Sequence, residues 1–157
     1  MEFTDYHTRL AAYALLIDGS DEVDGQQRVL LTWWNGEGHS DPQWSLPGGG
    51  IEFDEAVLDG LVREVFEETG HHIEPGPLLV EDFFTGRGRT FDGWFRSQRF
   101  VFDATITGGV LGTTEVDGST DLAAWVPLSD LEGQPRADIV DVALAAHAAR
   151  RAGESRP

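Results

Sequence analysis

The chain has 157 residues, of which 40% are hydrophobic, and this is enough to bury the core of a single domain over residues 1–157. Its formal net charge is −17, so we expect no stable binding to nucleic acid or to an acidic membrane surface. There are no cysteines, which excludes disulfides, thiol nucleophiles and thiolate metal sites, and no lysines, which excludes Schiff-base chemistry.

The N-terminal residues do not have the pattern of a targeting segment. The stretch from Met1 to Asp5 is acidic and lacks the apolar run of a secretory signal. No apolar stretch approaches the roughly 20 residues that a membrane-spanning helix needs. We therefore expect a cytoplasmic protein with no membrane contact. The sequence leaves open whether it forms a homodimer.

Apolar runs separated by glycine-rich and acidic turns predict five β-strands. The predicted strands cover residues 10–17, 28–34, 78–85, 96–106 and 122–126. The motif from Glu74 to Pro77 is expected to break the chain before the third of these strands. An alanine-rich helix is predicted over residues 138–151, with core contacts from Ile139, Val142 and Leu144. Strands combined with helices indicate α/β layers around a mixed β-sheet.

A second helix is predicted between Asp54, a suitable N-cap, and Gly70, which tolerates the left-handed conformation just past a helix end. At 100° per residue, its side chains form an apolar arc and a neighbouring acidic arc. The apolar arc contains Leu58, Val62, Val65 and Phe66, and the acidic arc contains Glu64, Glu67 and Glu68. Such a charge run is commonly a solvated helix face, but carboxylates are also the ligands that Mg²⁺ prefers.

Three consecutive glycines, Gly48 to Gly50, lie directly upstream of this helix. Glycines let the backbone approach a ligand or a metal ion closely, although a glycine triplet alone would indicate a flexible turn. Next to three carboxylates, the triplet favours a metal site over a solvated surface.

The segment from Gly49 to His71 resembles the Nudix box of the Nudix hydrolase family. That motif is glycine, five residues, glutamate, seven residues, then Arg-Glu-apolar-any-Glu-Glu-any-Gly-apolar. The matching positions are Gly49, Glu55, Arg63, Glu64, Val65, Glu67, Glu68 and Gly70. Only His71 departs from the motif, and Ile73 can supply the missing apolar packing. The resemblance implies a single Nudix domain with the α/β/α sandwich fold around a mixed sheet.

The resemblance also implies a role for each matching residue. Glu64, Glu67, Glu68 and the Gly49 carbonyl would bind Mg²⁺ or Mn²⁺, and Gly48 is a neighbour with the same potential. Glu64 is the first candidate for activating the attacking water. Arg63 belongs to the catalytic group and would pair with Glu55, which has a supporting role. A further acidic ligand from outside the box is expected at Glu115 or Asp121, and the sequence does not separate the two.

The activity that the resemblance implies is that of a Nudix pyrophosphohydrolase. It would cleave a phosphoanhydride bond in a nucleoside diphosphate linked to another moiety, such as a nucleoside triphosphate or a nucleotide sugar. Arg87 and Arg89 are the first choice for phosphate contact, and Trp94 for stacking on a base.

The sequence leaves alternatives open for the substrate and for the class of the protein. The chain has no tyrosine after Tyr13 and no proline between Pro77 and Pro127, so the family's signals for ADP-ribose and for dinucleoside polyphosphates are both missing. The alternative to an enzyme is a non-catalytic, nucleotide-sensing Nudix-like module. Such modules typically lose box carboxylates, whereas this chain keeps all of them.

Overall fold

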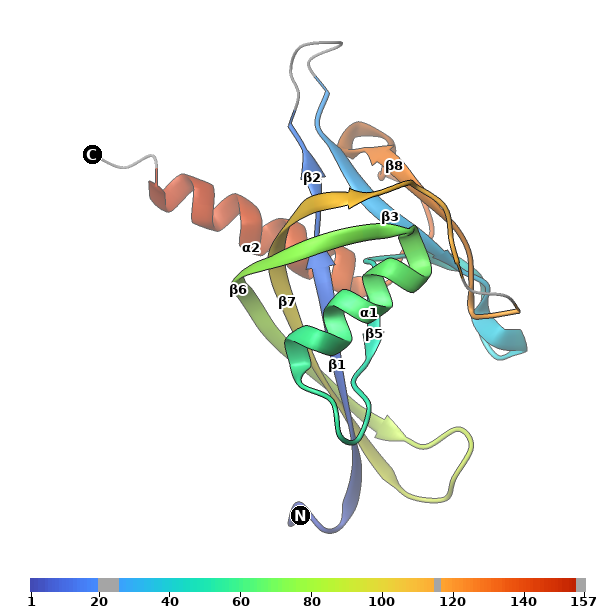
Figure 1. Cartoon of the computed structure of the whole chain (residues 1–157). Helices are drawn as coiled ribbons and strands as arrows, with labels where there is room; N and C mark the ends of the chain where they lie inside the picture. The colour runs from blue at the N-terminus through green and yellow to red at the C-terminus, as the bar shows by residue number, and fades with distance from the viewer. Residues whose placement is uncertain (20–25, 115–116, 155–157) are drawn as a thin grey trace.

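The computed structural model of the protein describes residues 1–19, 26–114 and 117–154. Within these ranges the chain forms β-strands, two α-helices and two short 3₁₀ turns, labelled η (Figure 1). In chain order the elements are β1 (Tyr6–Leu15), β2 (Ile17–Asp18), β3 (Arg28–Trp34), η1 (Gly36–Gly38), β4 (Gln43–Ser45), β5 (Gly48–Gly50), α1 (Val57–Thr69), β6 (His71–Arg87), β7 (Trp94–Gly109), β8 (Thr120–Pro127), η2 (Leu128–Asp130) and α2 (Asp138–Glu154).

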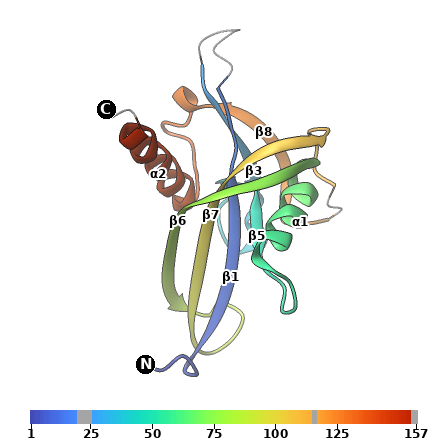
Figure 2. The same cartoon turned by 60° about the vertical axis from the view of Figure 1, so that its left-hand side comes forward.

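The strands form two sheets that lie between the two helices. The first sheet has the order β5-β1-β7-β6 and is mixed, because β1 and β7 run parallel while the other neighbours are antiparallel. The second sheet is antiparallel, with β3 pairing with β2, β4 and β8. Figure 2 shows α1 on one side of the strands and α2 on the other. The predicted α/β/α sandwich around a mixed sheet is therefore confirmed.

The hydrophobic core has two layers, one under each helix. Leu30 of β3 packs in the layer that contains Leu61 of α1. Leu31, its neighbour in the chain, packs in the other layer with Ile139 of α2. Successive strand residues point to opposite faces, so a single strand fills both layers. A one-residue slip of β3 would exchange the two sets of side chains and lose both layers of packing.

The five predicted strands overlap β1, β3, β6, β7 and β8, but β1 begins earlier, at Tyr6, and the short strands β4 and β5 were not predicted. The largest difference lies around the proline motif. Strand β6 starts at His71 and runs through Pro75 and Pro77. Its pairing with β7 shifts between Pro75 and Leu78, and β6 is the outer strand of its sheet. The prediction of a chain break at this motif was wrong, because an irregular outer strand tolerates residues that cannot donate a backbone hydrogen bond.

Helix α1 ends as predicted but begins later. Gly70 has φ +73°, and its N–H donates to Phe66 O, which confirms it as the residue that ends the helix. The N-cap is Ala56, without a side-chain cap, so the prediction of Asp54 as N-cap was wrong. The residues before Ala56 form a separate turn, in which Glu55 N–H donates to Glu52 O.

The buried face of α1 is also rotated from the predicted one. Leu58 was expected in the core, but its surface is 45% exposed, and Leu61 and Val65 form the buried stripe.

Helix α2 matches its prediction more closely. Ile139 is buried, while Val142 and Leu144 are partly buried against the same core layer. In the described part of the chain, neither helix combines the length and the apolar character needed to cross a bilayer.

Candidate active site

The glycine triplet forms strand β5 and is not a flexible turn. Gly48 has φ +135°, and a Cβ at this position would overlap Ala12 O of the neighbouring strand β1. A Cβ on Gly49 would lie 2.5 Å from Glu64 Oε2. Only glycine fits both positions, because β5 is pressed between the backbone of β1 and a carboxylate of α1.

The Glu68 carboxylate is buried where α1 meets both sheets. Only 8% of the surface of Glu68 is exposed. Gly48 N–H donates to Glu68 Oε2 at 2.9 Å, and Thr120 Oγ1 donates to Glu68 Oε1 at 2.7 Å. Glu68 therefore lies on the buried stripe of the helix, where it fixes the position of β5 and β8 relative to α1.

Arg63 forms ion pairs with three other acidic residues of the box, Glu55, Glu64 and Glu67. Its Nε and Nη2 donate to the two oxygens of Glu55 at 2.8 and 2.9 Å. Nη1 donates to Glu64 at 2.9 Å and to Glu67 at 3.3 Å, and Nη2 also donates to Gly50 O at 3.2 Å. A guanidinium has five N–H groups, so these contacts use all of them. The predicted pairing of Arg63 with Glu55 is confirmed.

The ion pair between Glu55 and Arg63 changes the acidity of both partners. The hydrogen bond from Arg63, and then the backbone N–H of Glu52, lower the pKa of Glu55 from 4.5 to about 2. The hydrogen bond to Glu55 in turn raises the pKa of Arg63 above its already high value, against the opposing effect of burial. Both groups remain charged at neutral pH, so the ion pair braces the turn before α1 against the helix.

The side chains of Glu64 and Glu67 converge on one nitrogen, Arg63 Nη1. Glu64 also lies against Gly49, so two carboxylates and the glycine strand share one position at the sheet edge. Such oxygen donors fit a hard divalent cation. Among residues 1–19, 26–114 and 117–154, however, no three His, Cys, Asp or Glu side chains lie close enough together to hold a metal ion. Glu64 and Glu67 are thus brought together, whereas Glu68 is committed to its internal hydrogen bonds.

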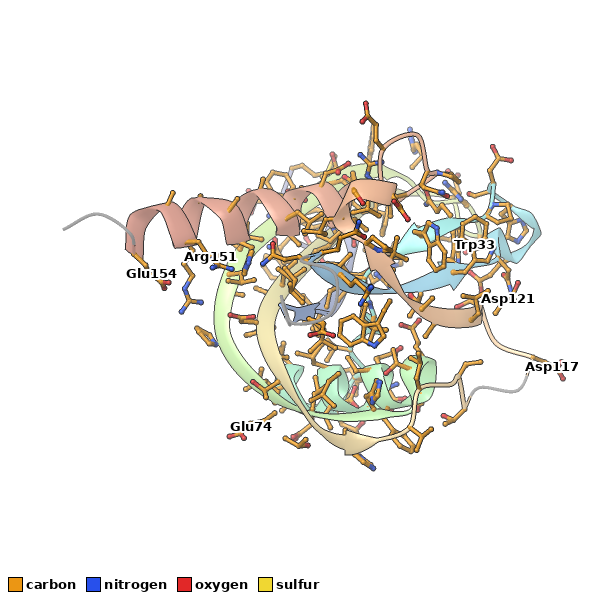
Figure 3. The ribbon with its side chains drawn as sticks, turned by 90° about the horizontal axis from the view of Figure 1, so that it is seen from above. Trp33, Glu74, Asp117, Asp121, Arg151 and Glu154 are labelled. Carbon is orange, nitrogen blue, oxygen red and sulfur yellow. The ribbon has the colours of Figure 1, made fainter. Side chains whose placement is uncertain are left out.

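Of the two acidic residues considered outside the box, only Asp121 is among the described residues, and it does not join this group. Glu115 lies outside the described residues. Asp121 accepts a 2.9 Å hydrogen bond from Asn35 Nδ2, and Figure 3 shows it near Trp33, with Asp117 farther out on its loop. Asp121 therefore helps to join the end of β3 to the start of β8, and its role as a metal ligand stays a prediction.

The hairpin that joins β6 and β7 carries the predicted substrate-binding residues Arg87 and Trp94. The Arg87 guanidinium lies 4.3 Å from the centre of the Trp94 ring. Trp94 pairs with Tyr6 of β1, whereas Gly49 pairs with Ala12. Positions 6 and 12 are roughly 20 Å apart along an extended strand. This distance separates the Arg87–Trp94 pair from the box carboxylates.

Arg89, the third predicted substrate-binding residue, points away from the Arg87–Trp94 pair. Its Nη1 donates a 2.6 Å hydrogen bond to Ser40 Oγ in the loop between η1 and β4. The hairpin tip thus contacts a loop of the other sheet. The structure does not gather Arg87, Arg89 and Trp94 into one phosphate-binding group.

Two residues near the box were missed by the sequence-based prediction. Thr120 lies far along the chain from Glu68, and no local pattern indicates their contact. Arg9 of β1 lies beside β5, with its guanidinium nitrogens 3.7 Å from the position that a Gly50 Cβ would occupy. Arg9 is exposed and has no hydrogen bond or ion pair with any residue that the structure describes. Arg9 precedes the apolar run from which this strand was predicted, so no pattern in the sequence indicated it.

Arg99 has a structural role on the face of the first sheet that is turned toward α2, opposite to the face covered by α1. It is buried, and it pairs with Asp82 of β6 and with Asp138 at the start of α2. Burial alone would lower the pKa of Arg99, but the bonds to the two carboxylates raise it. The hydrogen bond from Arg99 lowers the pKa of Asp138. This ion-pair network attaches α2 to the first sheet.

Comparisons with known proteins find a matching family and proteins of similar sequence and fold. The model of the NUDIX domain matches residues 7–146. The 8-oxo-dGDP phosphatase of Homo sapiens is 43% identical over 96 residues, which cover 60% of this chain but only 27% of that protein. The chain thus spans about a quarter of the length of this relative.

Two solved structures have the same fold. The E. coli ORF135 protein gives a TM-score of 0.66 at 21% identity, with 100% of both chains covered. The NUDIX domain of Shewanella oneidensis NrtR, complexed with ADP ribose, gives a TM-score of 0.66 at 22% identity, with 94% of this chain and 92% of that chain covered. At such identities these likenesses support the fold alone.

Proposed function

Because the chain belongs to the Nudix hydrolase family, we propose that it is a metal-dependent pyrophosphohydrolase acting on a nucleoside diphosphate linked to another group. The observation that carries the proposal is the convergence of Glu64 and Glu67 on Arg63 Nη1, beside the backbone of Gly49. Two negative groups held together at a sheet edge form an attractive site for a divalent cation.

The donor set fits Mg²⁺ or Mn²⁺, because it consists of carboxylate oxygens with a peptide carbonyl at hand. A cation bound there would offset the charge of the phosphate oxygens and lower the pKa of water. Glu64 is our candidate to accept the proton of the attacking water. Arg63 orients Glu64 and Glu67, and Glu68 holds β5 and β8 in register with the helix.

Arg9 is our candidate for contact with the substrate phosphates. A phosphate substrate approaches a chain of net charge −17, so positive groups at the site are needed to reduce the repulsion. Arg63 has already committed its N–H groups to protein acceptors. Arg9 lies beside Gly50, on the face of the edge strand β5 opposite to the one where Gly49 meets Glu64, so it would reach the phosphates around the sheet edge. It has no protein partner among the described residues. This position favours Arg9 over Arg89, which is bonded to Ser40.

For the substrate we propose a nucleoside triphosphate, with one that carries an oxidised purine as the first to test. The corresponding diphosphate, which lacks the further group, is tested beside it. The human relative is named for action on 8-oxo-dGDP, and a substantial part of this chain resembles it. A nucleotide sugar is the second class to test, since it also contains a nucleoside diphosphate linked to another group. A nucleotide sensor remains the alternative, and it predicts saturable nucleotide binding without turnover.

The test is hydrolysis of a substrate panel by the wild type and by Glu67→Gln, with Mg²⁺, with Mn²⁺ and with EDTA. The panel contains 8-oxo-dGDP, 8-oxo-dGTP, dGTP and a nucleotide sugar. Glu67→Gln would weaken the hold on the cation that offsets the phosphate charge, and loss of such transition-state stabilisation costs on the order of 100-fold in kcat. Glu67 is at the surface, its side chain 37% exposed, so the substitution should leave the stability nearly unchanged. EDTA should abolish the activity of the wild type.

Asp59→Asn is the matched control, because Asp59 is an exposed acid in the first turn of the same helix. It should keep wild-type kcat. Equal rates for the wild type and Glu67→Gln on every substrate would refute the proposed chemistry. Nucleotide binding by the wild type without product release would support the sensor.

A further inference from the structure

The far end of the β6–β7 hairpin carries a patch of aromatic and cationic side chains on one face of the first sheet. Trp94 is directly opposite Tyr6 on one side and Arg87 on the other. Arg96 lies two residues beyond Trp94, and Phe83 lies opposite Gln98, two residues beyond Arg96. Paired residues share a face, as do alternate residues of one strand. We call Tyr6, Phe83, Arg87, Trp94 and Arg96 the hairpin patch.

The hairpin patch borders a cavity. The cavity has a volume of about 330 Å³ and is lined by Met1, Tyr6, Thr85, Trp94, Phe95 and Arg96. Small-molecule sites in proteins commonly have volumes of about 300–1,000 Å³. The cavity is therefore large enough for one planar ring system with a small polar substituent.

The chemistry of the patch combines stacking surfaces with positive charge. Trp94 is 43% exposed and Phe83 is 51% exposed. The Arg87 guanidinium lies 4.3 Å from the centre of the Trp94 ring, and that of Arg96 lies 4.0 Å from the centre of the Phe83 ring. The acid paired with Arg87 is Asp92, at 3.8 Å and fully exposed, which is a weak ion pair. The patch thus concentrates cations in a strongly acidic chain.

We propose that the hairpin patch binds a free purine nucleotide, independently of hydrolysis at the box carboxylates. The base would stack on Trp94 at the cavity, and the phosphate would pair with Arg96 and Arg87. The separation of roughly 20 Å along β1 between the Trp94 and Gly49 positions is too great for one mononucleotide to occupy both sites. A long nucleic acid is disfavoured, because the remaining surface of a chain with net charge −17 would repel it.

The proposal competes with a purely structural explanation. Arginine side chains also lie along exposed aromatic rings without any ligand, because their stems cover apolar surface. The two explanations differ in one respect. If the patch binds a nucleotide, the Trp94 signal must shift when the nucleotide is added, and the shift must depend on Arg96. If the arginines only cover the aromatic rings, neither result is expected.

The experiment follows the indole N–H signals of the five tryptophans by ¹⁵N NMR during titration with GMP in EDTA. Trp94→Phe assigns the Trp94 signal. Any purification tag should follow the C-terminal end, since Met1 lines the cavity. We expect a saturable shift of the Trp94 signal, with the other indole signals nearly unchanged. Guanosine and inorganic phosphate, titrated separately, should each bind more weakly than GMP.

Arg96→Gln should weaken GMP binding by about tenfold or more, because it removes a charge-assisted contact. Arg150→Gln is the matched control, since Arg150 lies on α2 and pairs with Asp103 and Glu154. It makes the same change in net charge and should bind GMP as the wild type does. Unchanged positions of the other four indole signals show that each variant is folded.

A Trp94 signal that does not move, or equal GMP affinity for Arg96→Gln and Arg150→Gln, would overturn the proposal. The titration contains no divalent metal and measures no turnover. Its outcome is thus separate from that of the hydrolysis test, and either proposal can fail without the other.

Discussion

Thr120 Oγ1 donates a 2.7 Å hydrogen bond to Glu68 Oε1, which joins the start of β8 to the last turn of α1 across 52 positions of the chain. Both residues are buried. A buried carboxylate is stable only when its oxygens are hydrogen-bonded. Together with Gly48 N–H, Thr120 supplies one donor for each oxygen of Glu68.

Thr120→Val should therefore destabilise the fold and reduce hydrolysis. Valine keeps the shape but leaves Glu68 Oε1 without this donor, which costs about 1.5–3 kcal/mol for a hydrogen bond to a charged group. The measurement is urea denaturation combined with kcat on the best substrate of the panel. Thr120→Ser keeps the hydroxyl and is the control. If serine and valine reduced the free energy of unfolding equally, the hydroxyl would not be the important group.

Glu55→Gln should make the free energy of unfolding less dependent on pH in acid. The pKa of Glu55 is about 2 in the folded protein and 4.5 as the ordinary value, so the folded state favours the charged carboxylate. The stabilisation is complete above about pH 4.5 and is lost as the pH falls toward 2. The wild type should exceed Glu55→Gln in stability near pH 6, and the difference should shrink as the pH approaches 2.

The control for this pH series is Glu52→Gln, because Glu52 is exposed and contributes its backbone N–H to Glu55, not its carboxylate. It should follow the wild type across the series. A stability difference between the wild type and Glu55→Gln that stayed constant from pH 6 to pH 2 would contradict the assigned ion pair.

Gly48→Ala should be strongly destabilising. The residue has φ +135°, which side chains rarely adopt, and the new methyl group would overlap Ala12 O. Backbone strain of this kind costs about 1–3 kcal/mol before the steric overlap is added. Gly86→Ala is the control, because no heavy atom lies within 4 Å of its Cβ position. Thermal unfolding should separate the two variants clearly, and similar midpoints would mean that β5 is not tightly packed on β1.

Arg9→Gln should raise KM for a phosphate substrate by about tenfold with little change in kcat, if Arg9 contacts the phosphates. Arg89→Gln should raise KM less, because Arg89 is bonded to Ser40. Steady-state kinetics on the same substrate compares the two. The ranking is wrong if Arg89→Gln gives the larger increase in KM, and in that case the hairpin tip would be part of the substrate site.

The sequence was most informative where contacts are local. The left-handed Gly70 and the pairing of Glu55 with Arg63 both lie within the box segment, and the structure confirms both. The start of α1 was placed at Asp54 because a carboxylate there could cap a helix. The competing turn between Glu52 and Glu55 displaced that start, and the spacing of acidic residues gives no sign of it.

Contacts between segments that are distant in the chain could not be predicted from the sequence. The burial of Glu68 depends on Thr120, and the position of Arg9 depends on how β1 pairs with β5. The separation between Trp94 and Gly49 likewise follows from the register of β1 against two other strands. These relationships are set by strand pairing, which a single sequence does not specify.

The strand pairing of β1 has a consequence for synthesis of the chain. Strand β1 supports the glycine strand β5 on one edge. In the described part of the chain, its other edge pairs with β7 alone, from Tyr6 opposite Trp94 to Leu15 opposite Asp103. During translation α1 is therefore made before β7. When α1 emerges, the edge of β1 that will pair with β7 still has unpaired N–H and C=O groups. Such a border can recruit other nascent chains. A ribosome that pauses before residue 94 would prolong that exposure, and folding of the box must wait for a segment made much later.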